Sequence, residues 1–191
     1  MNTYDAIAAR RSIRKFKSES LPEDAMETIL KAATLAPSGK NRQPWQFYVV
    51  GEDKRNEMID IMRDALAAWK ERGEDTGSAK WTTDIMETAP ATVFVINPDG
   101  VDPWEPHTVD QQFQELVDTQ SIGAAIQNML LAAQDLGIGS LWICDVLYAI
   151  TELKTWLGAQ GELIAAVSFG MPDESPAARP RKPMDEVVRT V

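Results

Sequence analysis

Residues 110–136 are predicted to form one long helix, around which the rest of the fold must be arranged. Its second half, from Ile122 to Leu136, carries apolar side chains on nearly every side. A helix that is hydrophobic all round is buried, so we expect this one at the centre of the domain or at a subunit interface. Gly137 and Gly139 follow it and mark its end.

Shorter segments around this helix alternate between helical and strand-like patterns. Apolar spacing predicts helices over residues 3–9, from Pro22 to before Pro37, over 58–69 and over about 150–157. Continuous apolar runs predict strands at 47–50, 91–96, 140–144 and 163–169. The tail from Met171 carries four prolines and is unsuited to building a core of its own. The pattern predicts one α+β domain over residues 1–191, without naming a fold.

Composition excludes several classes of protein. The chain has 29 acidic and 19 basic residues, a formal charge of −10, and so negative a surface repels nucleic acid and anionic membranes. No run reaches the roughly 18 apolar residues that cross a bilayer, and the start of the chain does not resemble a secretory signal. The single cysteine, Cys144, excludes an intrachain disulfide and a cysteine-rich metal site. We therefore expect a cytoplasmic protein with no nucleic-acid, membrane or metal partner.

Few side chains suit acid–base or nucleophilic catalysis. The only histidine, His107, lies in a proline-rich loop, where a solvated side chain is the simplest interpretation. Gly137-Ile138-Gly139 lacks the third glycine of a dinucleotide-binding turn and precedes a strand. Cys144 follows an apolar strand, a position more typical of a packed thiol than of a reactive one. With no protein residue predicted to be catalytic, a bound cofactor is the expected carrier of the chemistry.

Basic residues gather in two places that are far apart in the sequence. The first is Arg10-Arg11-Ser12-Ile13-Arg14, followed by Lys15 and Lys17, and the second comprises Arg179, Arg181 and Lys182. Guanidinium groups offer planar, paired donors that suit a phosphate. Two cationic islands on an acidic protein indicate a site for a small anion, although an exposed basic loop is the alternative for the first.

A second distinctive segment runs from Ala36 to Trp45, between a predicted helix and a predicted strand. Pro37 and Pro44 stiffen it, and Gly39 permits a close approach of the backbone. Polar groups come from Ser38, Asn41 and Gln43. The segment suits a ligand-contacting loop, and an ordinary helix-to-strand connection is the alternative.

Taken in order, these segments resemble the nitroreductase family, which combines an Arg-Arg-Ser-x-Arg run with a later Pro-Ser-x-x-Asn-x-Gln-Pro-Trp loop. Residues 124–133 and 137–143 are similar to the family's central helix and the strand after it. Residues 169–172 and 179–183 are similar to its closing strand and basic tail. Each motif alone is weak, but the ordered set spans nearly the whole chain.

The resemblance implies a nitroreductase-like α+β fold. Its sheet is mixed and mainly antiparallel, helices flank it, and one long helix is central. It also implies an intertwined homodimer with two FMN sites at the interface, in which the tail of residues 172–191 wraps the partner subunit. The implied phosphate and ribityl contacts are Arg10, Arg11, Ser12, Arg14, Arg179 and Arg181. The loop over the partner's flavin is assigned Pro37, Ser38, Gly39 and Asn41, and the flavin edge Leu141, Trp142, Ile143 and Cys144.

The activity implied by the resemblance is that of an FMN-dependent NAD(P)H oxidoreductase. NADH or NADPH would deliver hydride to flavin N5, and an electron-poor acceptor such as a nitroaromatic or a quinone would take the electrons in a ping-pong cycle. Residues 63–82 and 97–113, with Trp69, Trp81, Trp104 and Phe113, are expected to cover the flavin.

Other functions fit the same motifs. Family relatives that dehalogenate, dehydrogenate or cleave a flavin are one alternative, and a non-catalytic FMN-binding protein or a cofactor-free dimeric scaffold are others. The chain also departs from the family pattern, since Cys144-Asp145 stands where many members have a glycine or a Glu-Gly pair.

Overall fold

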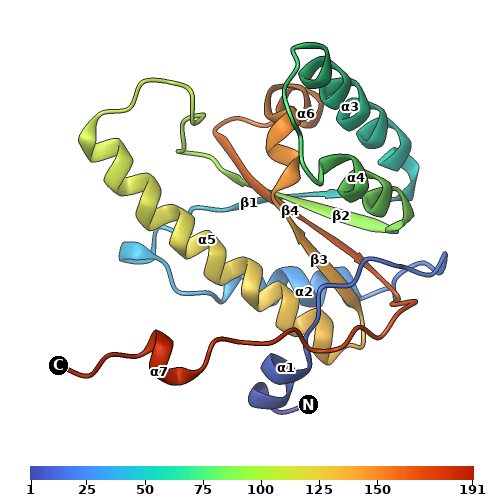
Figure 1. Cartoon of the computed structure of the whole chain (residues 1–191), viewed down its shortest axis with the longest axis vertical. Helices are drawn as coiled ribbons and strands as arrows, with labels where there is room; N and C mark the ends of the chain where they lie inside the picture. Colours follow the sequence, from blue (N-terminus) through green and yellow to red (C-terminus); the bar gives the residue numbers. More distant parts are fainter.

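The computed structural model describes residues 1–191, with a four-stranded antiparallel sheet that carries helices on both faces (Figure 1). The strands are β1 (Gln46–Val50), β2 (Ala91–Asn97), β3 (Gly139–Ile143) and β4 (Glu162–Gly170), in the order β1-β2-β4-β3. The helices are α1 (Thr3–Ala9), α2 (Ala25–Thr34), α3 (Glu52–Glu71), α4 (Ala79–Thr88), α5 (Val109–Asp135), α6 (Ile150–Leu157) and α7 (Met184–Val187). Two 3-10 turns, η1 (Gly39–Asn41) and η2 (Asp145–Ala149), complete the chain. The predicted α+β fold with a mainly antiparallel sheet and a long central helix is confirmed.

The core is divided by the sheet into two layers. Val93 and Val95 of β2 belong to the layer under α2 and α5, whereas Phe94 and Ile96 belong to the layer under α3, α4 and α6. This alternation follows from the two-residue period of a strand, and both faces are apolar because helices cover both. Figure 1 shows α2 and α5 on one side of the sheet and the other three helices opposite.

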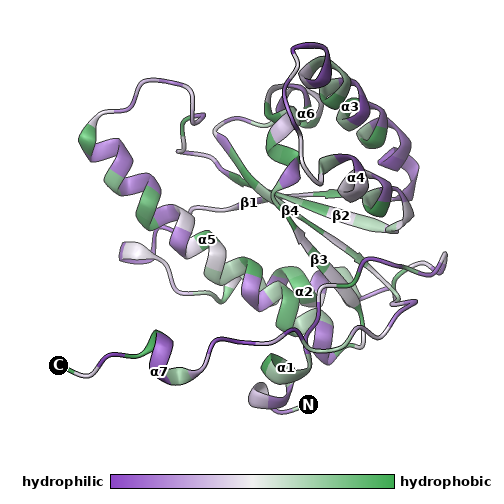
Figure 2. Cartoon of the chain, viewed as in Figure 1, coloured by the Kyte–Doolittle hydropathy of each residue, from purple (hydrophilic) through white to green (hydrophobic).

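Helix α5 begins with a capping box, in which the Thr108 side chain and the Gln111 side chain satisfy each other's backbone N–H groups. Its second half buries Ile122, Ile126 and Met129 against the sheet, so the predicted central position is confirmed. Its first half extends past the sheet, and apolar residues continue there (Figure 2). Exposed apolar side chains on that part are Val109, Phe113, Leu116 and Val117.

Three expectations from the sequence need correction. Helix α2 begins at Ala25 rather than in the turn at Pro22, because the Pro22 carbonyl closes a turn with the Ala25 N–H at 3.0 Å. Helix α4 was not predicted, since its buried face includes Thr82 and Thr83, which interrupt the apolar stripe. The Thr83 hydroxyl is satisfied by the Ala79 carbonyl at 2.8 Å, so it can be buried there.

The third correction concerns His107, whose side chain was expected to be solvated and is largely buried. Only 10% of it is exposed, and Nε2 lies 3.0 Å from Glu115 Oε1 on α5. The loop that carries His107 is folded back onto the start of α5, which a composition rich in proline does not reveal. Regarding membranes, no helix is both long enough and apolar enough to span one.

Candidate functional site

The N-terminal basic segment lies between the edge strand β3 and the beginning of the tail. Ser12 forms a parallel bridge with Ser140, and the Ile13 N–H donates to the Ser140 carbonyl at 3.0 Å. On the other side, the Lys17 N–H donates to the Met171 carbonyl and the Asp173 N–H donates to the Lys15 carbonyl, both at 2.9 Å. The segment is therefore fixed by backbone bonds on both sides.

Close packing holds the same segment against the sheet. Ile13 and Phe16 are buried, and each lies over a glycine at the end of a strand. A Cβ on Gly139 would lie 3.0 Å from Ile13 Cγ2, and a Cβ on Gly170 would lie 2.8 Å from Phe16 Cδ1. The polar residues next to these two anchors, Arg10, Arg11, Ser12 and Arg14, face outward and line a cavity.

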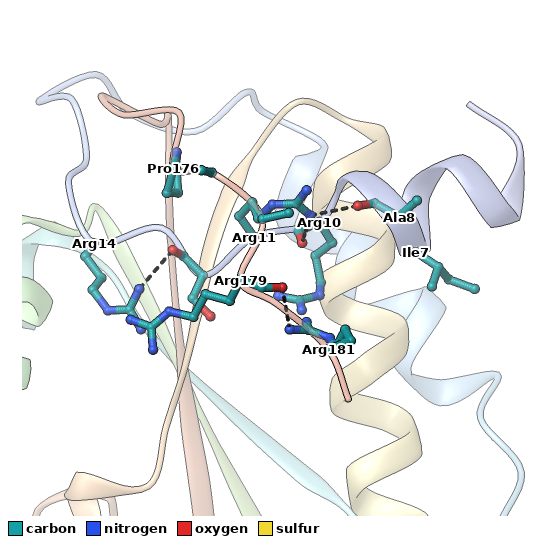
Figure 3. Close-up of a pocket in the computed structure, with 11 residues that line it drawn as sticks. Ile7, Ala8, Arg10, Arg11, Arg14, Pro176, Arg179 and Arg181 are labelled. Atoms are coloured by element: carbon teal, nitrogen blue, oxygen red, sulfur yellow. Dashed lines mark hydrogen bonds between the residues drawn. The ribbon is translucent and has the colours of Figure 1, made fainter. Parts of the chain in front are cut away.

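The outward side chains meet the second basic cluster in one cavity of about 370 Å³ (Figure 3). All six residues assigned from the sequence to the phosphate and ribityl chain line it: Arg10, Arg11, Ser12, Arg14, Arg179 and Arg181. The rest of the wall is small and apolar, from Ile7 and Ala8 of α1 and from Pro176, Ala177 and Ala178 of the tail. Two segments about 170 positions apart in the chain thus place five guanidinium groups around one space.

None of the five guanidinium groups forms an ion pair with a carboxylate. Partial burial lowers the pKa of Arg10, and the positive charges of Arg181 and then Arg11 lower it further. A pKa depressed by burial and by like charges means that the protonated form is held at a cost. Unpaired cations that face each other across a cavity are the arrangement expected of an anion-binding site.

The guanidinium hydrogen bonds go to backbone carbonyls. Arg11 Nη1 donates to the carbonyls of Ala8 at 2.7 Å and Arg10 at 2.8 Å, which caps the end of α1. Arg14 Nη1 donates to the Ser12 carbonyl at 3.2 Å, and Arg181 Nη1 donates to the Arg179 carbonyl at 3.2 Å. Since a guanidinium has five donors, most remain available to a ligand.

The predicted flavin edge lies beside this cavity, at the end of β3. The Ser140 carbonyl faces the outer edge of the sheet, and the alternation of an antiparallel strand gives the Trp142 backbone groups the same direction. Leu141 and Ile143 are buried, whereas the Trp142 side chain is 40% exposed. The strand can therefore offer backbone donors to a ligand that extends from the arginine cavity along its outer edge.

Cys144 and Asp145 follow directly. Cys144 is exposed, which corrects the expectation of a packed thiol. Desolvation by its neighbours, and then the Asp145 carboxylate, raise the pKa of the thiol, so the group is a poor nucleophile at neutral pH. Asp145 accepts hydrogen bonds from the Ser78 and Thr82 hydroxyls and so ties the end of β3 to α4.

The Pro37–Trp45 loop is not brought to the arginine cavity of its own chain. In Figure 1 the light-blue loop, which contains η1, emerges on the opposite side of α5 from the dark-blue segment of residues 10–14. Lys40, Asn41 and Gln43 have φ values of 53°, 55° and 53°. This conformation costs roughly 1–2 kcal/mol each at Lys40 and Gln43 and less at Asn41, so the loop needs strong anchoring.

One contact in the site was not predicted from the sequence. The Arg14 guanidinium lies over the Trp81 ring, 5.5 Å from its centroid. Trp81 was grouped with a general aromatic cover, because α4 was not recognised as a helix that faces the basic segment. A helical period through Ala79, Thr83 and Met86 was the available signal.

The fold and the arginine cavity are those expected of a nitroreductase-like protein. The model of the nitroreductase family matches residues 7–171. The chain belongs to the nitroreductase family.

Individual relatives agree in length as well as in sequence. An Archaeoglobus fulgidus protein, described as an NADH dehydrogenase or NAD(P)H nitroreductase, is 34% identical over 175 residues, which cover 88% of this chain and 84% of the relative. A Thermotoga neapolitana iodotyrosine deiodinase is 25% identical over 197 residues, which cover 97% and 95%. A crystal structure from Desulfovibrio desulfuricans, described as a nitroreductase in complex with FMN, is 28% identical with a TM-score of 0.76, covering 100% of this chain and 97% of that one.

Proposed function

We propose that this chain is an FMN-dependent oxidoreductase that takes electrons from NADH or NADPH and passes them to an electron-poor organic acceptor. The observation that carries the proposal is the cavity in which five guanidinium groups meet without a carboxylate. Family membership and a relative of known structure described in complex with FMN support the choice of cofactor. The relative described as an NAD(P)H nitroreductase supports the choice of electron donor.

The residues present fit the phosphate end of FMN. Arg10, Arg14, Arg179 and Arg181 offer charge-assisted donors to a dianion, and Ser12 adds a hydroxyl. Arg11 is partly used in capping α1, so its share is the smallest. The small lining residues on the tail leave room for a ribityl chain beside the cations.

The outer edge of β3 would hold the ring system. Backbone groups at Trp142 face outward, and amide donors at that edge favour negative charge on a ring that approaches it. When bound, FMN supplies the redox chemistry, accepting a hydride from NADH or NADPH and returning the electrons to an acceptor such as a nitroaromatic or a quinone. One pocket serves donor and acceptor in turn, which corresponds to ping-pong kinetics.

The proposal includes a homodimer. Four of the fourteen predicted site residues belong to the Pro37–Asn41 part of the loop, which lies away from the cavity of its own chain (Figure 1). An exposed apolar surface of Phe113, Leu116 and Val117 on α5 lies beside this loop, since Val117 contacts Gly39. A second copy that covers this surface would bring its loop to the first copy's flavin, and the exposed tail of residues 172–191 would wrap the partner.

The first test is the visible spectrum of the purified protein, followed by rapid mixing. We expect a yellow protein whose flavin band bleaches when NADH or NADPH is added without oxygen and returns on mixing with menadione or nitrofurazone. A colourless protein that takes up no added FMN would overturn the proposal. A yellow protein that bleaches but is never reoxidised by these acceptors would reduce it to flavin binding alone.

A second candidate function follows from the relative that is an iodotyrosine deiodinase, which aligns with 97% of this chain. A reductive dehalogenase would use the same FMN site with a different cover. It predicts slow bleaching with NADH and NADPH, and rapid reoxidation of dithionite-reduced protein by iodotyrosine. Fast bleaching together with no response to iodotyrosine would exclude it.

A further inference from the structure

Arg42 connects the Pro37–Trp45 loop to the core through a carboxylate that the sequence did not single out. Its Nε lies 3.4 Å from Asp118 Oδ1 and its Nη2 lies 3.4 Å from Asp118 Oδ2, a side-by-side arrangement of two forked groups. Asp118 is only 1% exposed. Gln114, one turn earlier on α5, donates to Asp118 Oδ1 at 2.9 Å, so the carboxylate is held from two sides.

Two neighbours of Asp118 on the same helix hold the start of the loop. Ser121 Oγ accepts from the Gly39 N–H at 3.3 Å, and its own hydroxyl donates to the Val117 carbonyl at 2.8 Å. A Cβ on Gly39 would lie 2.5 Å from Val117 Cγ1, so the loop backbone contacts the helix directly. Val117, Asp118 and Ser121 therefore form one face of α5 against which the loop is fixed.

The loop between these anchors is strained. Lys40, Asn41 and Gln43 adopt left-handed backbone conformations, and Ser38 Oγ accepts from the Gln43 N–H at 3.0 Å to close the turn. Such conformations persist only where surrounding contacts determine them. Arg42 stands between Asn41 and Gln43 in this strained run, so its ion pair is the contact best placed to hold it.

A second carboxylate near Arg42 does not share this role. Asp99 Oδ2 lies 3.2 Å from Arg42 Nη2, but its side chain is 70% exposed. Exposed ion pairs contribute little because water screens them, whereas a buried carboxylate left unpaired is strongly disfavoured. The Arg42 guanidinium thus has a strong anchor in Asp118 and a weak anchor in Asp99. Substituting each carboxylate in turn gives a test variant and its matched control.

We propose that Asp118 is a positioning residue. It holds Arg42, and through it residues 37–43, in the shape from which the loop reaches the partner subunit's flavin. The inference rests on the proposed function for its effect on the flavin, but the ion pair and the strained loop are features of the chain itself. Asp118 then acts on the reaction through Arg42 without touching substrate or cofactor.

The test compares Asp118→Asn with Asp99→Asn in the FMN-loaded protein. Lys40 and Arg42 are trypsin sites inside the loop, so limited trypsin digestion reports directly on whether the loop is held. We expect cleavage there to be about tenfold faster in Asp118→Asn and unchanged in Asp99→Asn, because the loop opens locally once its anchor is lost. Flavin reduction at saturating NADH or NADPH should fall about tenfold in Asp118→Asn only, with altered visible circular dichroism of the flavin.

Each outcome decides the matter. Cleavage at the wild-type rate in Asp118→Asn would overturn the inference, and so would faster cleavage with unchanged flavin kinetics and circular dichroism, since Asp118 would then be merely structural. If Asp118→Asn does not fold, Arg42→Lys keeps a positive charge beside Asp118 and keeps the trypsin site, but it removes the forked pairing and is expected to give the same two changes to a smaller extent. Wild-type protein that binds no FMN would overturn the proposed function and the positioning role together, and digestion would then decide separately whether the ion pair holds the loop.

Discussion

Two regions of the molecule contain clustered charges of mainly one sign. They differ in whether groups of the protein itself pair with those charges. The arginine cavity brings five cations together with no carboxylate paired to any of them. At the opposite end of β4 from Gly170, the carboxylates of Asp102, Glu115 and Glu162 lie close enough together to affect one another's charge. There Lys154 Nζ lies 2.7 and 2.8 Å from the two Asp102 oxygens, and His107 Nε2 lies 3.0 Å from Glu115 Oε1.

The third carboxyl of this region, that of Glu162, holds its proton to a much higher pH than an ordinary carboxyl does. Burial, and then the charges of Glu115 and Asp102, raise the pKa of Glu162 to about 7, against smaller opposing effects of His107 and Lys154. Protein groups therefore offset part of the charge in this carboxylate cluster, through the Lys154–Asp102 ion pair and the raised pKa of Glu162. In the arginine cavity no protein carboxylate pairs with the guanidinium groups, so their charge is available to an anionic ligand. This distinguishes a binding site from a structural charge cluster.

The largest expected effect is the loss of cofactor binding from the arginine cavity. Replacing Arg10 and Arg14 together by Ala should weaken FMN binding at least about 100-fold, since two charge-assisted donors are lost. The ligand-free protein should unfold at the same temperature or slightly higher, because repulsion with Arg181 is relieved. Calorimetric titration and thermal unfolding measure the two effects, with Lys17→Ala as the matched basic control outside the cavity.

A substitution in the carboxylate cluster should lower stability and leave FMN binding unchanged. Lys154→Met should lower the free energy of unfolding by about 2 kcal/mol, because it leaves the largely buried Asp102 carboxylate unpaired. The unfolding temperature should fall by about 4–8 °C with FMN affinity unchanged. Lys54→Met, which breaks the exposed pair with Glu57, should change neither. A loss of FMN affinity in Lys154→Met would contradict the distinction between a region that only stabilises the fold and a region that binds the cofactor.

Truncation tests whether the tail belongs to the arginine cavity. Ending the chain after Glu174 keeps the backbone bonds to Lys15 and Lys17 but removes Arg179 and Arg181, and it should weaken FMN binding about tenfold. It should also weaken the dimer, measured by sedimentation. Ending the chain after Lys182 should spare FMN affinity and still weaken the dimer. An unchanged dimer in both truncations would contradict the wrapped-tail arrangement.

The smallest effect concerns the pH dependence of stability. Glu162 has a folded-state pKa raised from 4.5 to about 7, so its contribution is fully present below about pH 4.5 and is lost as the pH rises through 7. After allowance for solvent screening, the loss is about 1 kcal/mol. Urea unfolding across this range should show it in the wild type and not in Glu162→Gln. Glu152→Gln on the exposed side of α6 should behave as wild type.

Much of the fold could be predicted from the chain because local patterns encode it. The apolar stretch from Ile122 to Leu136 placed α5, and the runs at 91–96 and 163–169 placed the central strands. Helix α4 was missed because Thr82 and Thr83 occupy buried positions that a hydrophobic pattern assigns to apolar residues. A hydroxyl that bonds to its own helix backbone gives no sign of burial in the sequence.

For the site, the sequence predicts which residues take part but not which contacts bring them together. Both basic clusters stand out in the sequence, but their meeting in one cavity depends on Ser12 joining β3 and Lys15 joining the tail, contacts that no local pattern specifies. The Arg42–Asp118 pair and the burial of His107 were missed for the same reason. Each joins single polar residues across long stretches of chain, and only the folded structure determines which of them meet.

If the arginine cavity recognises the phosphate of the flavin, FMN and riboflavin should bind with very different affinities. Titration of the flavin-free protein with each should give at least about 100-fold weaker binding of riboflavin, which lacks only the phosphate. In the Arg10→Ala/Arg14→Ala variant the difference between the two ligands should nearly vanish. Equal affinities of the wild-type protein for FMN and riboflavin would contradict the account.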